Sequence, residues 1–364
     1  MASLEFTTPA PQRSSARSLL RPLGAGKRVL DRVVWFFDGS EVARSKGATR
    51  IRRGIALLFF AYGLELAVSN LARGGFPSMG QGIMLMLSVA LLVNRGGEFV
   101  RDLLAVILAL FSYGLVSTYA EKLNFTVHYA PQVDAERFLF HGTLPTVWLQ
   151  HHLGTSGTAP LALFSVVMYL SHFVVPAVLG FAMWIKRDRR TFQALMFGLI
   201  TVTLIGEMTF VLAPTAPPWL ASQHGFTPHI DHLLKQAMQG LHLDQLAVRE
   251  GNPHSYNIVA AMPSLHAAFP VVGLLVAAHY ALPRWVRAAL VLQFLGIVFA
   301  IVYMGDHYVV DAVAGVAYAY AAWFLVRRGL RADEELRSAN AESAYVPAGA
   351  AVAVTPATGP RAGD

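Results

Sequence analysis

The sequence contains no cysteine, which excludes a disulfide framework, a thiolate metal site and a cysteine nucleophile. Charge is scarce as well, because only 14% of the residues are charged while 55% are hydrophobic. Soluble domains do not have this composition, so water is excluded as the main solvent of the chain. The sequence also lacks a glycine-rich phosphate loop, an HExxH zinc motif and an internal repeat.

The formal net charge of +7 comes from basic residues in the N-terminal arm and between apolar segments, not in one patch. This distribution argues against nucleic-acid binding and is typical of topology signals in membrane proteins. Residues 1–50 contain no long apolar segment, so we expect no cleavable signal peptide.

Eight segments are apolar over roughly the 17 to 25 residues that cross a bilayer, although the second is shorter. They cover residues 54–72, 80–94, 102–120, 160–185, 192–213, 265–281, 285–304 and 307–327. The sequence therefore predicts an all-α, polytopic membrane helix bundle with about eight transmembrane helices. Its expected parts are a disordered basic cytoplasmic arm (1–52), N-terminal transmembrane helices (53–120), a catalytic membrane domain (121–328) and a disordered cytoplasmic tail (329–364).

The positions of Lys and Arg predict how the chain is oriented. If both termini are cytoplasmic, most of the basic residues lie inside, as the positive-inside rule requires. The long loops 121–159 and 214–264 then lie outside, and they hold nine of the 13 histidines. We therefore predict an integral protein of the plasma membrane with its active site on the non-cytoplasmic face.

The segment Met262-Pro-Ser-Leu-His266 directly precedes the sixth predicted span. Proline is favoured in the first turn of a helix, so Pro263 indicates a helix N-terminus with free N–H groups here. Such an end attracts anions, while Ser264 adds a hydroxyl and His266 adds a titratable donor. This combination is suited to holding a phosphate and protonating its leaving oxygen.

The segment His307-Tyr-Val-Val-Asp311 begins the eighth predicted span. A spacing of four places His307 and Asp311 on one helix face, where the carboxylate can hold one ring nitrogen. The sixth and eighth spans run in the same direction, so both histidine motifs lie on the same side of the membrane. Either motif alone is also explained by an ordinary polar contact, but together they indicate a nucleophile and a general acid.

A third segment, Pro214-Thr-Ala-Pro-Pro-Trp219, follows the fifth span on the same face. By itself it is explained as a stiff helix terminator with an interfacial tryptophan. Beside the other two motifs, we expect Pro217 and Trp219 to form a wall of the pocket. His172 and Glu207 lie inside spans, where ionisable groups either bridge helices or act in function, and we count His172 among the substrate-binding candidates.

These motifs resemble a known family. The two histidine segments look like the second and third signature motifs of the type-2 phosphatidic acid phosphatase superfamily. Residues 214–219 are similar to the branch that contains fungal inositol phosphorylceramide synthase, with sphingomyelin synthase as a more distant relative. The resemblance covers roughly residues 140–328 and implies a six-helix phosphatase-type core.

The resemblance also implies roles for the site residues. His307 would attack phosphorus and form a phosphohistidine, Asp311 would orient it, and His266 would protonate the leaving alcohol. Ser264 would bind phosphate oxygens, and we add Pro263 and Tyr308 to the substrate-binding candidates. The family needs no metal or other cofactor, which agrees with outer-loop histidines that lack metal-ligand spacing.

The sequence differs from the phosphatase branch in the cationic residues of its motifs. That branch has a Lys and an Arg-Pro in its first motif and an arginine six residues before the nucleophile, where this chain has Ile301. Fewer cations suit a phosphodiester better than a phosphate monoester. We therefore predict a phosphotransferase that moves a head group, phosphoinositol by analogy, from a phospholipid donor to a lipid or sugar acceptor.

Two alternatives stay open at this point. A lipid phosphate phosphatase acting on phosphatidic acid or an isoprenoid diphosphate would use the same residues, with water as the acceptor. A proton-coupled transporter would instead use Glu207 and His172 as an intramembrane relay.

Overall fold

A computed structural model describes residues 46–73, 79–104, 126–241 and 256–344 of the chain. The regular structure in these ranges is helical, apart from single β-bridges that join His128, Thr215 and Ala260. The chain divides into two compact units: residues 1–118 and 235–255 form the first, and the other residues form the second. The all-α prediction is confirmed for the described part of the chain.

In the first unit, α2 (Lys46–Ala72) packs against α3 (Met79–Leu92). The helices approach closely at Gly63, where an added Cβ atom would lie 2.9 Å from the Cε atom of Met84. α2 contains a 20-residue apolar span, but α3 has only 14 residues and is shorter than the hydrocarbon core. Residues 96–104 are helical too, and the predicted span 102–120 lies mostly outside the described residues.

Five helices form a bundle in the second unit: α7 (Pro160–Ile185), α8 (Arg189–Leu212), α12 (Leu265–His279), α13 (Arg284–Tyr303) and α14 (Val309–Ala344). α12 packs against each of the other four and so forms the centre of the bundle. Its buried face includes Val272 and Val276, which belong to one core with Leu195 of α8 and Trp323 of α14. The helix that carries His266 is therefore the most enclosed one.

The outside of both units is apolar, as a membrane requires. Large hydrophobic side chains such as Leu58, Phe173 and Leu292 are more than half exposed. Within the described ranges, five helices are long and apolar enough to cross a bilayer, namely α2, α7, α8, α13 and α14, while α3 and α12 are shorter apolar helices. The chain is therefore an integral membrane protein with a polytopic helix bundle.

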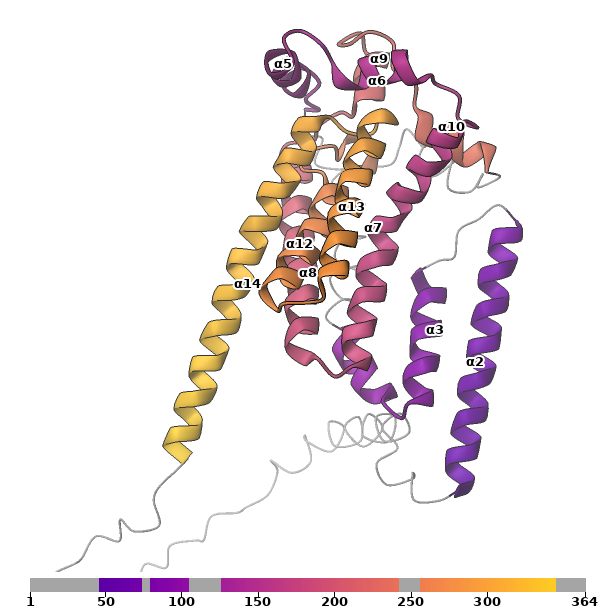
Figure 1. Cartoon of the computed structure of the whole chain (residues 1–364), viewed down its shortest axis with the longest axis vertical. Coiled ribbons are helices and arrows are strands. Elements are labelled where there is room, and N and C mark those ends of the chain that lie inside the picture. Colours follow the sequence, from indigo (N-terminus) through magenta and orange to yellow (C-terminus); the bar gives the residue numbers. More distant parts are fainter. Residues whose placement is uncertain (1–45, 74–78, 105–125, 242–255, 345–364) are drawn as a thin grey trace, which may run out of the picture. The chain divides into compact units, whose positions relative to one another are not determined.

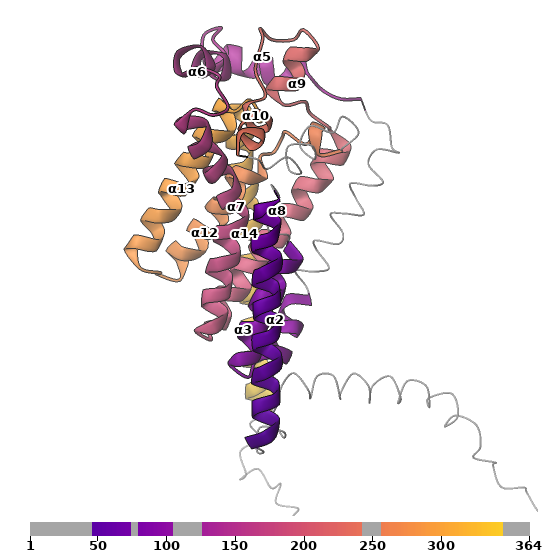
Figure 2. The same cartoon turned by 90° about the vertical axis from the view of Figure 1, so that its right-hand side faces the viewer.

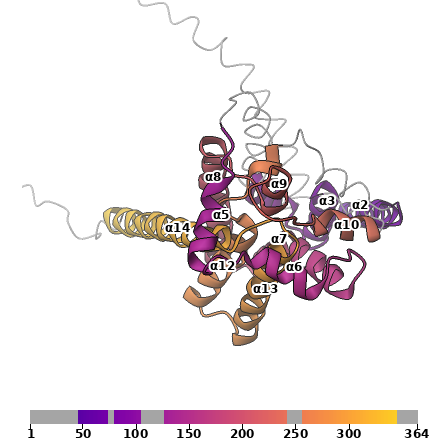
Figure 3. The same cartoon turned by 90° about the horizontal axis from the view of Figure 1, so that it is seen from above.

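Short helices cover one end of the second unit. α5 (Ala130–Leu139), α6 (Pro145–Leu153) and α9 (Pro218–Gln223) gather there in Figures 1 and 2, and Figure 3 shows the bundle from this end. The 3-10 helix η2 (Tyr256–Val259) leads from this end into α12. The helix α10 (Leu233–Gly240) begins in the second unit, and its residues from Lys235 onward belong to the first. The predicted outer loops thus contain ordered helices.

Two predicted boundaries are wrong. The arm was expected to be disordered to residue 52, but α2 begins at Lys46. The tail was expected to be disordered from residue 329, but α14 continues to Ala344 and extends beyond the other helices of its bundle (Figure 1). The physical reason is the same for both helices, because residues outside the apolar span can still be good helix formers. In α14, Ala, Arg, Leu and Glu dominate residues 329–344.

Candidate active site

The structure brings the two predicted histidines into direct contact. His266 is the second residue of α12, and His307 lies two residues before α14. Nδ1 of His266 lies 3.1 Å from Nε2 of His307, and the ring planes meet at 61°. The expectation that the two rings share one site is confirmed, whereas their chemical roles remain predictions.

The hydrogen bonds of His307 fix the tautomers of both rings. Nδ1 of His307 lies 2.8 Å from the carbonyl oxygen of Ala261, and because a carbonyl only accepts, this nitrogen carries the proton. In the neutral ring, Nε2 of His307 then keeps its lone pair, so Nδ1 of His266 donates to it. The unprotonated nitrogen of His307 and the N–H donor of His266 thus face each other.

Asp311 acts on His307 less directly than the sequence suggested. Its carboxylate is completely buried, and Oδ2 lies 3.6 Å from Nδ1 of His307, outside hydrogen-bonding distance. The same oxygen accepts a hydrogen bond of 2.8 Å from the backbone N–H of Tyr308 and so caps the start of α14. Ala261 holds the ring nitrogen instead, while Asp311 supplies a nearby negative charge.

Pro263 and Ser264 shape the start of α12. Pro263 lies before the helix, so its predicted place in the first turn is wrong, and Ser264 is the N-cap. The Ser264 hydroxyl accepts from the N–H of Ala267, and the Ser264 N–H donates to the carbonyl of Asp311 at 3.0 Å. Ser264 is fully buried, so its main visible contribution is to join the two histidine segments.

Gly315 makes this junction possible. An added Cβ atom at Gly315 would lie 2.2 Å from the carbonyl oxygen of Ser264, far inside contact distance. Glycine therefore allows α12 and α14 to approach each other one turn beyond Asp311.

His172 reaches the same site from α7. Its ring centroid lies 4.1 Å from that of His266, in an edge-to-face arrangement, and its Nδ1 donates to the carbonyl of Tyr169. The ring of Tyr169 lies 4.4 Å from that of His266 as well. His172 thus lies against His266, and its predicted contact with the substrate stays a prediction. Tyr169 was missed because a tyrosine in an apolar span gives no signal of its own.

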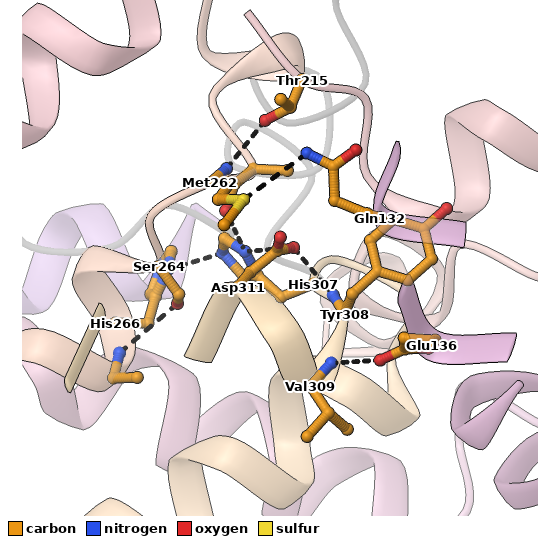
Figure 4. A network of polar contacts seen from close by, with 12 residues as sticks. Gln132, Glu136, Thr215, Met262, Ser264, His266, His307, Tyr308, Val309 and Asp311 are labelled. Atoms are coloured by element: carbon orange, nitrogen blue, oxygen red, sulfur yellow. Dashed lines mark hydrogen bonds and ion pairs between the residues drawn. The ribbon is translucent and has the colours of Figure 1, made fainter. Parts of the chain in front are cut away.

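The third motif positions Ala261. Thr215 donates its N–H to Val259 and accepts from Ala261, and its hydroxyl accepts from the N–H of Met262 at 2.9 Å (Figure 4). The carbonyl of Ala261 is thereby aimed at His307. Thr215, which the sequence analysis placed only in a wall segment, thus holds the backbone that fixes the His307 ring.

Pro217 and Trp219 support the turn before His307. Pro217 is the N-cap of α9, and the N–H of Trp219 donates to the carbonyl of Gly305 at 3.1 Å. The Trp219 ring stacks on His232, whose Nε2 lies 3.1 Å from Oδ1 of Asp306. These contacts brace the segment that carries His307, and substrate contact by Pro217 or Trp219 remains a prediction.

Glu136 is a site residue that the sequence analysis missed. Its fully buried side chain reaches from α5 to accept a hydrogen bond from the N–H of Val309, the first residue of α14 (Figure 4). Burial, and secondarily the charge of Asp311, raises the pKa of this carboxyl from 4.5 to about 7. An isolated glutamate in a polar outer segment gave no sequence signal, because its partner is a backbone group 173 residues away.

Tyr308 lies between Glu136 and His307. Its side chain is 1% exposed, its hydroxyl has no hydrogen-bond partner among the described residues, and burial raises the pKa of that hydroxyl. It packs against Val133 of α5 and Leu144, the N-cap of α6. Tyr308 thus anchors α14 to the cover of the bundle, and its predicted substrate contact stays a prediction.

Comparison with known proteins matches the sequence around this site to a family. The sequence model of one family, described as the PAP2 superfamily, matches residues 135–325. A phosphoinositol dihydroceramide synthase of Bacteroides thetaiotaomicron is 30% identical over 170 residues, which cover 46% of this chain and 56% of the relative. The chain thus matches little more than half the length of that relative. No solved structure matches the chain.

Proposed function

Because the chain belongs to the PAP2 superfamily, we propose that it is a lipid phosphotransferase that works through a phosphohistidine on His307. The group transferred is phosphoinositol, by similarity to the synthase from Bacteroides, and the acceptor is a lipid such as dihydroceramide or a sugar. The observation that carries the proposal is the contact between Nδ1–H of His266 and the lone pair on Nε2 of His307.

The two rings supply the two groups that a double displacement needs. Nε2 of His307 attacks phosphorus, and the bond from phosphorus to the oxygen of diacylglycerol breaks as His266, which enters this step protonated on both ring nitrogens, gives that oxygen a proton and becomes neutral. The acceptor hydroxyl then attacks the phosphohistidine and returns its proton to His266. The phosphoryl group leaves Nε2, and both rings regain their starting state.

The surroundings of His307 favour a phosphodiester substrate. Ile301 occupies the position where the phosphatase branch has an arginine, and its side chain is completely buried in the bundle. A diester carries one negative charge, so it needs fewer cations than a monoester with two. This supports head-group transfer over the phosphatase alternative, in which water receives the group.

The transporter alternative receives no such support. His172, one of the two residues of the supposed relay, is accounted for by its contact with His266. Membership of an enzyme family and a matched pair of histidines favour group transfer instead.

We propose further that the active site faces the non-cytoplasmic side of the plasma membrane and that both termini are cytoplasmic. The histidine pair lies at the end of the bundle that α5 covers, because Glu136 of α5 accepts a hydrogen bond from Val309, two residues after His307. The basic turns between α7 and α8 and between α12 and α13 lie at the other end, where Lys186, Arg190 and Arg284 meet the anionic inner leaflet.

Proteoliposomes test the proposed reaction. The vesicles contain the purified protein, phosphatidylinositol labelled in its inositol ring, and dihydroceramide. We expect label in a sphingolipid together with an equal amount of diacylglycerol, and neither product with His307→Ala. Release of the label as a water-soluble inositol phosphate, at a rate that does not depend on the acceptor, would establish hydrolysis instead.

A further inference from the structure

A groove lies between α12, α13 and α14 at the end of the bundle away from the histidines. Its volume is about 540 Å³. Its apolar lining includes Leu274 and Leu275 of α12, Val291 of α13 and Tyr320 of α14, and its polar lining is Arg284 and Arg287 of α13. None of the described residues that line it is acidic. The groove thus combines an apolar floor with two positive charges.

This groove is separate from the active site. His266 stands at the N-terminus of α12, and the turn into α13 follows the C-terminus of the same helix. α12 has 15 residues, so the arginines lie about 20 Å from His266 along the helix axis. Figures 1 and 2 both show this turn at the opposite end from α5, α6 and α9. A molecule in the groove would leave the histidine pair untouched.

The two arginines are placed to bind one anion. Their spacing of three puts Arg284 and Arg287 on the same face of α13, in its first turn. Nε of Arg287 is buried and has no hydrogen-bond partner among the described residues, so a buried donor of this cation is unsatisfied. An oxygen of a phosphate at this point would satisfy it with a charge-assisted hydrogen bond.

The apolar part of the groove has the character of an acyl-chain site. Val291 lies one turn further into α13 than Arg287, so the lining becomes apolar as it runs from the helix end toward the middle of the membrane. Trp285, beside Arg284, is 72% exposed, as expected for a tryptophan at the level of the head groups. Charge at the interface and hydrocarbon below it match the two halves of a phospholipid.

We propose that this groove is a binding site for an anionic phospholipid, distinct from the substrate site. The lipid phosphate pairs with Arg284 and Arg287, and one acyl chain lies on Leu274, Leu275 and Tyr320. Bound in this way, the lipid links the α12–α13 hairpin to α14. The hairpin carries His266, and α14 carries Asp311, which lies near His307. This site does not depend on the proposed function.

Native mass spectrometry with defined lipids tests the site. The probes are phosphatidylglycerol and phosphatidylcholine with identical acyl chains, added to the delipidated protein in detergent. We expect the wild-type protein to retain phosphatidylglycerol in preference to phosphatidylcholine. The double variant Arg284→Gln, Arg287→Gln should bind phosphatidylglycerol about 30-fold more weakly, or roughly fivefold for each arginine near a membrane surface.

Two further variants distinguish lipid binding in the groove from a general effect of positive charge on lipid binding. Ala288→Trp fills the groove without removing a charge, and it should also lose phosphatidylglycerol. Arg331→Gln removes the same charge from α14 beyond the groove and should bind as the wild type does. Equal retention of phosphatidylglycerol by all four proteins, or equal binding of the two lipids by the wild type, would overturn the proposal.

Discussion

Nδ1 of His266 and Nε2 of His307 lie only 3.1 Å apart, so the two rings occupy the space that a phosphorus atom needs. A nucleophile approaches its target at about 3 to 3.5 Å. A general acid must at the same time lie about 2.6 to 3.2 Å from the leaving oxygen, on the far side of phosphorus. The nucleophile–phosphorus distance and the acid–oxygen distance together are longer than the 3.1 Å between the two ring nitrogens. The substrate must therefore move the rings apart and break their hydrogen bond.

Substitution of each histidine should affect a different step. With a phosphoinositol nitrophenyl ester, the leaving group needs no proton, so His266→Ala should still release about one nitrophenol per protein in the first turnover. His307→Ala should release none. With the natural phospholipid, His266→Ala should lose about 10²- to 10⁴-fold in rate, as expected for loss of a general acid.

The measurement is a rapid-mixing burst of nitrophenol absorbance in detergent. The wild-type protein with a saturating acceptor provides the control for full turnover. A burst from His307→Ala, or none from His266→Ala that is folded by size-exclusion chromatography, would contradict the assigned roles.

Asp311 should have separable structural and electrostatic effects. Asp311→Asn keeps an oxygen for the N–H of Tyr308 but removes the charge near His307, so we expect a rate loss of about 10- to 100-fold with a nearly unchanged melting temperature. Asp311→Ala also removes the cap of α14 and should cost about 1 kcal/mol of stability in addition. Rates and thermal unfolding of both variants check this, and identical melting temperatures would mean that the cap contributes nothing.

Glu136 should make stability depend on pH. Its pKa is higher in the folded chain, about 7, than the usual 4.5, so the folded state binds the proton more tightly. The free energy of unfolding contributed by this group is therefore greatest below about pH 4.5 and falls as the pH rises to about 7, by at most about 3 kcal/mol. Thermal unfolding of the wild type and Glu136→Gln from pH 4 to pH 8 measures the difference. Parallel profiles of the two proteins would contradict it.

The sequence predicted the parts of this site that depend on helix direction. Spans six and eight cross the membrane in the same sense, which was enough to place His266 and His307 on one side, and the structure confirms their contact. The bounds 160–185 of α7 were also predicted correctly, because Pro160 begins the helix and the basic residues after Ile185 end it.

The missed features involve the backbone. The acceptor for Nδ1 of His307 is the carbonyl of Ala261, and the donor to Glu136 is the N–H of Val309. Every residue has such groups, so no side-chain pattern in the sequence distinguishes these two. Only the folded chain, with Thr215 fixing the segment before α12, shows which carbonyl reaches the ring. The side of the membrane on which the site lies stays a prediction.

Gly315 should tolerate no side chain. Gly315→Ala forces a methyl group against the carbonyl of Ser264, so we expect a loss of about 1 to 3 kcal/mol in stability and a lower transfer rate. Gly329→Ala is the matched control, because the same change further along α14 meets no atom within 4 Å and should stabilise the helix by up to about 1 kcal/mol. Thermal unfolding of the two variants compares them directly, and equal shifts would show that the close approach is unimportant.

The 36 residues of α14 make a rod about 54 Å long, against about 30 Å of hydrocarbon. With its first turn beside His307 at one interface, the rod projects well past the other interface into water. Since the natural chain offers no thiol, a single Ala332→Cys substitution on this projection would be the sole target of a maleimide. A maleimide that does not cross membranes is applied to intact cells and then to opened cells. Its reaction reports which compartment the projecting end of α14 enters. The histidines at the other end of α14 then face the opposite compartment.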